Sequence, residues 1–354
     1  MGEAIISRAT AIPDEVLNPI YPVEGRHVMV VTLRDYNGAI MQDYEINCKD
    51  GTATYNYKTN ESGQVKFSCN SGSANIFVNN KINGVRYFDF NQTWFNISAP
   101  VGDVSRINCN LSKSSGFADF ESSGSFASIE PVIVSNLILV GGGGGGGFSW
   151  VIDDGDGGYY DTGGGGGGAG YMNFYTKILF EKNKIYNLQI GYGGDGGKLP
   201  SNAYQFITSK SGGTSYIVGT SYSAVGGSGG GYGSNGGQKG IGGLGNGGNG
   251  TPNYTRLPIN SFYGQDSSID FAGGGGGGGA NYHVNIRSCA IGGSPYGGKG
   301  GIYGAFEGST ESAATQGSRG GGGGGAAATY TVRNYAGGLQ NGARGGNGIM
   351  RIYL

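Results

Sequence analysis

The sequence predicts an all-β N-terminal sandwich, followed by a glycine-rich domain in which left-handed extended helices pack side by side and are edged by β-strands. Three observations lead to this prediction. Of the 354 residues, 79 are glycine, which is sparse before about residue 140 and dense after it. The chain also carries 24 Tyr, 15 Phe and 2 Trp, whereas flexible linkers are poor in aromatic residues because they bury nothing. Short alternating segments precede the glycine.

Residues 27–112 have the pattern of a β-sandwich. The segment HVMVVTLRD is β-branched and partly alternating, and the Asn-Gly pair after it is typical of a tight turn. In YEINC, residues Tyr44, Ile46 and Cys48 fall on one face. The later segments ATYNYK, QVKF, ANIFVNN, GVRYFDF and TWFNIS continue at the spacing of roughly 8 to 12 residues that a sandwich requires.

One stretch of this region resembles a known class of modules. Thr59, Gly63, Val65 and Phe67 form the pattern Thr-x-x-x-Gly-x-Val-x-Phe, between VVTLRDYNGAI and CNSGSANIFV. These segments resemble the Ig-like or transthyretin-like sandwiches related to carboxypeptidase regulatory domains. The resemblance implies an Ig-like spacer or adaptor and no activity.

The continuous glycine runs indicate how the second domain is packed. A left-handed extended helix with three residues per turn has no internal hydrogen bonds, so its N–H and C=O groups need partners in neighbouring helices. Such helices approach closely only where no side chain separates them. We therefore expect continuous runs in the centre of a bundle and segments with glycine at every third residue at its periphery. The runs are residues 141–147, 163–168, 273–279 and 320–325.

The glycine-rich segments are similar to a second family. VIVSNLILVGGGGGGG, TGGGGGGAGYMNF, AGGGGGGGANY, RGGGGGGAAATY and GGNGIMRIYL resemble the glycine-rich domains of tail-fibre and adhesin proteins of tailed phages, and MGEAIISRA looks like the start of fibre proteins in phages and phage-tail-like particles. In that family polyglycine-II helices form a sandwich whose loops at one end contact the host receptor. The resemblance implies an attachment segment (1–26), an Ig-like sandwich (27–112) and a polyglycine-II domain (113–354).

The implied function is that of a tail-fibre or baseplate adhesin in the virion tail, synthesised in the host cytoplasm. Its N-terminal region would bind other virion tail proteins, and its loops would bind a host-cell surface glycan or protein. A structural virion protein of the baseplate or capsid, without receptor binding, remains the alternative. The formal charge of −1 lacks the basic excess of a nucleic-acid-binding protein, and no apolar run is long enough to insert into a membrane.

Loops between the glycine runs are the expected binding regions, because binding residues concentrate on loops held by a rigid scaffold. Residues 149–161, residues 252–266 and the segment from 281 carry aromatic and arginine residues typical of binding anchors. The predicted receptor-binding residues are Trp150, Tyr159, Tyr160, Tyr254, Arg256, Phe262 and Tyr282. The predicted scaffold residues, one for each run, are Gly144, Gly165, Gly276 and Gly322.

The sequence predicts no enzyme, cofactor or metal. GSPYGGKGG nearly matches a phosphate-binding loop, but Gly300 stands where Ser or Thr must bind magnesium. The two histidines are far apart, and no Ser/His/acid group is present. Asp153, Asp154 and Asp156 offer oxygen ligands for calcium but lack the EF-hand spacing, so we interpret them as a solvated acidic loop.

The four cysteines are widely spaced and form no CxxC motif. This spacing indicates neither a zinc site nor a disulfide scaffold, and we expect buried, reduced thiols. The opening MGEAIISRATAIPDEV has no basic n-region and no uninterrupted apolar region, so we expect no signal peptide. The cysteines are Cys48, Cys69, Cys109 and Cys289.

Overall fold

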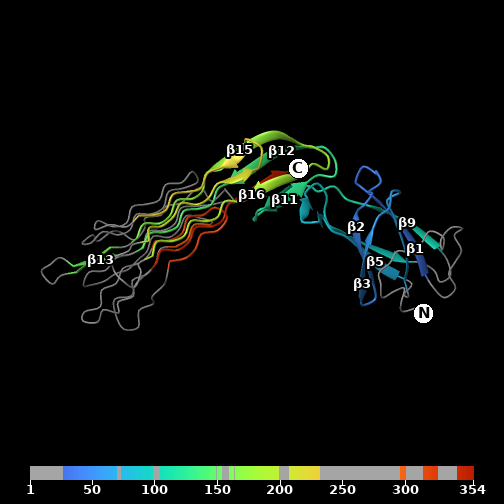
Figure 1. Ribbon diagram of the computed structural model, residues 1–354, viewed down its shortest axis with the longest axis horizontal. Coiled ribbons are helices and arrows are strands. Elements are labelled where there is room, and N and C mark those ends of the chain that lie inside the picture. The colour runs from blue at the N-terminus through green and yellow to red at the C-terminus, as the bar shows by residue number, and fades with distance from the viewer. Residues whose placement is uncertain are drawn as a thin grey trace.

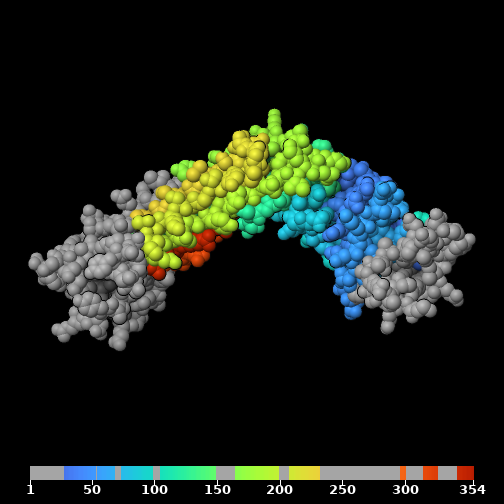
Figure 2. All heavy atoms as spheres, viewed as in Figure 1, coloured from blue at the N-terminus to red at the C-terminus, as the bar shows by residue number. Residues whose placement is uncertain are grey.

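The computed structural model is all-β in the residues that it describes. These residues form a two-sheet sandwich at the N-terminal end, a six-stranded and a four-stranded sheet, extended glycine segments that run away from those sheets, and a two-stranded hairpin (Figure 1). Figure 2 shows a bent, elongated outline with the sandwich on one arm. No helix among the described residues is long and apolar enough to span a membrane. The described residues are 27–69, 73–98, 104–148, 150–153, 159–162, 164–198, 207–231, 296–299, 314–325 and 341–354.

The first sheet of the N-terminal sandwich has three strands. β1 (His27–Arg34) lies in its centre, antiparallel to β4 (Gln64–Cys69) and parallel to β9 (Val104–Asn110). Because successive residues of a strand point to opposite faces, β1 contributes to two apolar clusters. Met29, Val31 and Leu33 enter the main core, and Val28 and Val30 pack against Val104 on the other face.

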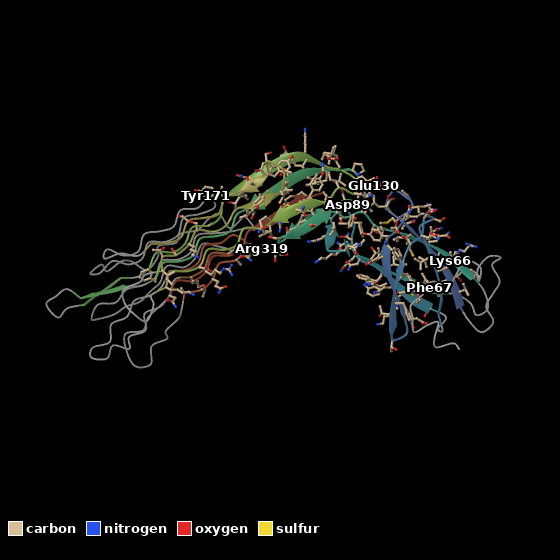
Figure 3. All side chains as sticks on the ribbon, viewed as in Figure 1. Lys66, Phe67, Asp89, Glu130, Tyr171 and Arg319 are labelled. Atoms are coloured by element: carbon tan, nitrogen blue, oxygen red, sulfur yellow. The ribbon has the colours of Figure 1, made fainter. Side chains whose placement is uncertain are left out.

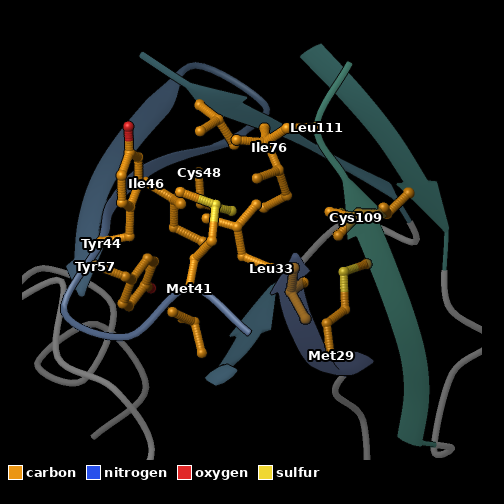
Figure 4. Packing of buried hydrophobic residues seen from close by; sticks show 14 of the residues in the cluster. Met29, Leu33, Met41, Tyr44, Ile46, Cys48, Tyr57, Ile76, Cys109 and Leu111 are labelled. Carbon is orange, nitrogen blue, oxygen red and sulfur yellow. The ribbon is translucent and has the colours of Figure 1, made fainter. Parts of the chain in front are cut away.

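The second sheet has the order β3 (Ala53–Lys58), β2 (Glu45–Asp50), β5 (Ser73–Val78) and β8 (Thr93–Ser98), and all its pairs are antiparallel. Its inner face packs on the first sheet over a single apolar core (Figure 4). This arrangement agrees with the predicted Ig-like sandwich. The core includes Met29, Leu33, Ile46, Cys48, Ile76 and Leu111.

The motif that carried the first resemblance has a structural role at each position. The buried Thr59 hydroxyl donates to the Met41 carbonyl at 2.6 Å and accepts from the Tyr44 amide at 2.8 Å. Gly63 has φ of +67°, and its carbonyl accepts from the Leu33 amide at 2.8 Å. The predicted Asn-Gly turn also forms. An antiparallel bridge joins Arg34 to Ile40 across it, but the next strand, β2, enters the other sheet.

A six-stranded sheet joins the two parts of the chain. Its first strands, β6 (Lys81–Ile82) and β7 (Val85–Tyr87), precede residue 113, the predicted domain boundary. β7 pairs in parallel with β11 (Gly124–Ala127), which lies beyond that residue. The sheet continues through β16 (Tyr186–Gln189), β17 (Ser215–Ile217) and β18 (Ser223–Ala224).

A four-stranded antiparallel sheet packs against this one. Its order is β10 (Phe117–Phe120), β19 (Ile349–Tyr353), β12 (Val132–Val140) and β15 (Met172–Phe180). Apolar side chains from both sheets form a second core, in which Phe126 is fully buried. Strand β19 thus lies inside this sheet, between β10 and β12.

Asp89 ties the sandwich to the following sheets. Figure 3 places Asp89 and Glu130 together at the bend of the molecule. The Asp89 carboxylate, wholly buried, accepts from the Tyr36 hydroxyl at 2.8 Å and from the amides of Ile129 at 3.0 Å and Glu130 at 3.2 Å. Burial raises the pKa of Asp89, although these hydrogen bonds lower it.

We expect Asp89→Ala to lower the free energy of unfolding by about 2–3 kcal/mol, because the buried amide of Ile129 and the part-buried donors of Tyr36 and Glu130 lose their shared acceptor. Since its pKa is raised in the folded state, the contribution of Asp89 is largest below the ordinary carboxyl pKa of about 4 and decreases as the pH rises through the raised value. Urea denaturation of both proteins across this pH range tests the prediction. A loss that grows with increasing pH would contradict it.

Candidate functional site

The glycine segments continue directly from the strands of the two sheets. β12 leads into residues 141–147. Five other glycine segments directly precede or follow a strand of the six-stranded or the four-stranded sheet. The sheets therefore set the starting position and direction of each segment. The five are residues 164–171 before β15, 191–197 after β16, 209–213 before β17, 225–231 after β18 and 341–348 before β19.

Residues 141–147 form the central segment. Their amides donate hydrogen bonds of 2.7–3.0 Å to three neighbouring segments, and the partner changes at each residue. The same neighbour returns at every third residue, and all three neighbours run antiparallel to the central segment. Residues 141, 144 and 147 donate to segment 164–171, residues 142 and 145 to segment 209–213, and residues 143 and 146 to segment 341–348.

The carbonyl groups of the central segment accept hydrogen bonds from three other segments. Donors in 225–231, 191–197 and 320–325 reach these carbonyls at 2.8–2.9 Å. A Cβ atom added at any residue of 141–147 would overlap backbone atoms of one of these three segments. Only glycine permits this approach, which explains why the run is uninterrupted.

The six neighbours are also bonded to one another in a closed ring. Gly168 donates to Ser228, Gly212 to Gly227, Gly213 to Tyr192, Gly345 to Gly194, Gly346 to Gly321 and Gly167 to Gly323, each at 2.7–2.9 Å. We call residues 141–147 and this ring the glycine lattice. It meets the requirement that buried backbone groups find hydrogen-bond partners. In order, the ring segments are 164–171, 225–231, 209–213, 191–197, 341–348 and 320–325.

Side chains of the ring follow the same period of three. In segment 191–197, Tyr192 and Asp195 are exposed and the residues between them are buried glycines. In segment 341–348, Arg344 and Asn347 are exposed. Arg344 Nε lies 3.8 Å from Asp195 Oδ1, so neighbouring segments also contact each other through side chains on the outer surface. On these two segments every third residue therefore faces outward, and the residues between them are buried.

Three of the four predicted scaffold residues lie in the lattice. The Gly144 amide donates to Gly168 and its carbonyl accepts from Gly323, both at 2.8 Å. The Gly165 amide donates to Gly231 at 3.0 Å, and the Gly322 carbonyl accepts from Gly298 at 2.8 Å. Gly276, with its whole run, lies outside the described residues.

A β-hairpin at the far end of the lattice carries the first group of predicted binding residues. β13 (Trp150–Asp153) and β14 (Tyr159–Thr162) pair antiparallel, with Tyr160 opposite Ile152 and Tyr159 opposite Asp153. The hairpin connects the central segment to 164–171, whose antiparallel bond from Gly147 to Gly165 brings the hairpin ends together. In Figure 1, β13 lies at the opposite end of the molecule from β1.

The other predicted binding residues cannot be placed beside this hairpin. Tyr254, Arg256, Phe262 and Tyr282 lie outside the described residues, as do Asp154 and Asp156. The described part of the chain contains no cluster of three or more His, Cys, Asp or Glu residues that could hold a metal ion.

Two of the four cysteines can be assessed. Cys48 and Cys109 are buried thiols, as predicted. Burial raises the pKa of the Cys109 thiol to about 11, so it stays protonated and unreactive at neutral pH. The side chain of Cys69 and the whole of Cys289 are outside the described part.

An ion-pair network that was not predicted from the sequence lies on the outer face of the four-stranded sheet. Arg351 is nearly buried and donates to both carboxylate oxygens of Asp119, at 2.6 and 2.8 Å. Its guanidinium lies 3.9 Å from the centre of the Phe117 ring. Arg319, at the turn into residues 320–325 (Figure 3), pairs with Glu121 at 2.9 Å. The single arginine within the apolar C-terminal IMRIYL was the available signal, because a charge in a buried strand requires a partner.

Two solved structures are similar to parts of this chain at low sequence identity. A DUF3823 family protein from Parabacteroides merdae shares 9% identity over 47% of this chain and 90% of its own, with a TM-score of 0.21. A streptococcal ancillary pilin shares 9% identity over 55% of this chain and 59% of its own, with a TM-score of 0.22.

The comparison with curated proteins finds no match. The family described as "Glycine-rich domain" matches residues 122–354, which include every segment of the lattice and more than half of the chain. The chain therefore belongs to the glycine-rich domain family.

Proposed function

We propose that this chain is a tail-fibre or baseplate adhesin of a tailed phage or phage-tail-like particle. A polyglycine-II scaffold holds receptor-binding loops away from the N-terminal region, which attaches to other virion tail proteins. The receptor is a glycan or protein on the host-cell surface. The chain acts by binding and not as an enzyme.

The hydrogen-bond pattern supports the polyglycine-II part of this proposal. The central segment meets the same neighbour at every third residue, as a helix with three residues per turn requires. Its N–H and C=O groups are directed to six neighbours, which side chains would keep apart. We therefore infer that the segments of the lattice are polyglycine-II helices.

The position of the hairpin is the observation that carries the receptor-binding part. Trp150, Tyr159 and Tyr160 lie on β13 and β14, beyond the end of the lattice. Aromatic residues on a loop held by a rigid scaffold are typical of binding anchors. A lattice with most of its backbone groups paired provides this rigidity, since bending it would break many hydrogen bonds together.

Replacing Trp150, Tyr159 and Tyr160 with alanine is expected to abolish host-cell binding while the lattice stays folded. Binding of fluorescently labelled protein to a panel of bacterial cells is the measurement. The matched control replaces Tyr171, Tyr192 and Tyr216, three exposed tyrosines on the sides of the molecule, and should bind like the wild type.

Other outcomes would point elsewhere. Full binding by the folded hairpin variant would refute a receptor site on the hairpin. A wild-type protein that binds no cell, and that electron microscopy places within a baseplate or capsid, would favour the structural virion role.

A further inference from the structure

The outer face of the second sandwich sheet carries an exposed aromatic pair. Phe77 on β5 and Trp94 on β8 are directly opposite in the register, with ring centroids 4.5 Å apart. Trp94 is 58% exposed, although this residue type is usually buried to a large extent. Its neighbour Ile97, on the opposite face of β8, is in the core, so the pair lies on the face that turns away from the first sheet.

Amide side chains extend from this pair across the sheet. The register places Asn56, Asn47, Phe77 and Trp94 in one row over four strands, and Thr54, Lys49, Asn75 and Asn96 in the next. Asparagine is disfavoured in strands, and four in two adjacent rows add nothing to the core. Within the described residues, these four amides form no side-chain hydrogen bond with the protein.

The chemistry of this surface matches a neutral, hydroxyl-rich ligand. Each asparagine offers two donors and an acceptor, which suit hydroxyl groups. An exposed indole offers a flat apolar surface to the C–H groups of a sugar ring. Of the charged residues on this face, Glu45 and Lys58 are opposite in the register and have opposite sign. Lys49 is then the one charged side chain within the two rows, and its ammonium group can donate to a sugar hydroxyl group. Four strands at about 4.8 Å spacing give a platform roughly 14 Å across, the scale of a short oligosaccharide.

We propose that this face is a binding site for a neutral oligosaccharide, in which Trp94, supported by Phe77, stacks on a sugar ring and the asparagine rows bind its hydroxyl groups. The site is on the N-terminal sandwich and is separate from the hairpin. It would give the protein a carbohydrate contact at the other end of the molecule from the hairpin.

The two tryptophans of the chain, Trp94 and Trp150, allow a direct test with the full-length protein. In a Trp150→Phe variant, Trp94 is the only tryptophan and reports on its own environment. We expect immobilised neutral glycans on an array to capture the protein, and the corresponding free hexaose (cello-, malto- or chitohexaose among the probes) to shift the Trp94 emission. Trp94→Ala should weaken glycan binding by about ten-fold or more.

Matched variants separate the possible explanations. Tyr216→Ala, which removes another exposed aromatic, should bind glycans normally, and a double Asn47→Ala, Asn96→Ala variant should bind weakly while melting like the wild type. The triple hairpin variant should keep this glycan binding. Loss of its cell binding therefore tests the receptor site on the hairpin, and loss of glycan capture by Trp94→Ala tests the site on the sandwich. No capture by any neutral glycan, or equal capture by Trp94→Ala, would overturn the proposal. So would light scattering that shows a dimer of the wild type and a monomer of Trp94→Ala.

Discussion

Replacing Gly144 with valine is expected to prevent the glycine-rich domain from folding. A Cβ atom at this position would overlap the carbonyl group of Ser228, which is backbone and has no rotamer to change. Moving Ser228 would disturb its hydrogen bond from Gly168, and moving Gly144 would disturb those to Gly168 and from Gly323. The cost should exceed about 5 kcal/mol, comparable with the whole stability of many domains. Insoluble protein, or loss of the cooperative thermal transition, is the expected result.

Gly124→Val is the matched control for this substitution. Gly124 begins strand β11, and nothing lies within 4 Å of the position that its Cβ would occupy. Valine is favoured in strands, so this variant should be soluble and melt close to the wild type. A Gly144→Val protein that also melts like the wild type would show that the segments are not in backbone contact.

Phe126→Ala is expected to lower the free energy of unfolding by about 3–5 kcal/mol, the usual cost of removing a large buried ring. Phe126 is fully buried in the core between the sheets from which the lattice continues. Its ring lies 5.3–6.0 Å from the rings of Phe88, Phe120, Phe180 and Tyr186. The substitution would thus leave a cavity between the six-stranded sheet and the four-stranded sheet. Urea denaturation measures the resulting loss of the free energy of unfolding.

Phe174→Ala provides the comparison, because this phenylalanine is 58% exposed on strand β15. Its removal should change the free energy of unfolding by no more than about 0.5 kcal/mol. Equal effects of the two substitutions would show that the aromatic cluster does not stabilise the sheets.

The sequence predicted the parts of the fold that depend on local pattern. Alternation identified the strands of the sandwich. We expected every continuous glycine run in the centre of the bundle, and among the described runs this is correct only for 141–147. The described parts of the other runs, residues 164–168 and 320–325, are buried too, but they lie in the ring around that segment. Runs of similar length therefore differ in position, because each position depends on the strand or turn that the run continues from.

The remaining features depend on contacts between distant residues. The parallel pair of β7 and β11 joins strands on both sides of the predicted boundary at residue 113, and no local pattern specifies it. The proposed platform with Asn47, Phe77 and Trp94 arises only when three separate strands come into register. For the proposed receptor site, the sequence identified the aromatic hairpin residues, and their place beyond the end of the lattice follows from the antiparallel return at Gly165.

Amide hydrogen exchange of the central segment tests most directly whether the glycine lattice is a rigid scaffold. The amides of residues 141–147 donate to three surrounding segments inside a closed ring, so they should exchange only when the domain unfolds globally. Mass spectrometry should show that a peptide covering residues 139–148 retains its amide hydrogens for the same time as peptides from strand β12. Exchange of this peptide at the rate of an unfolded chain, while β12 remains protected, would contradict the account.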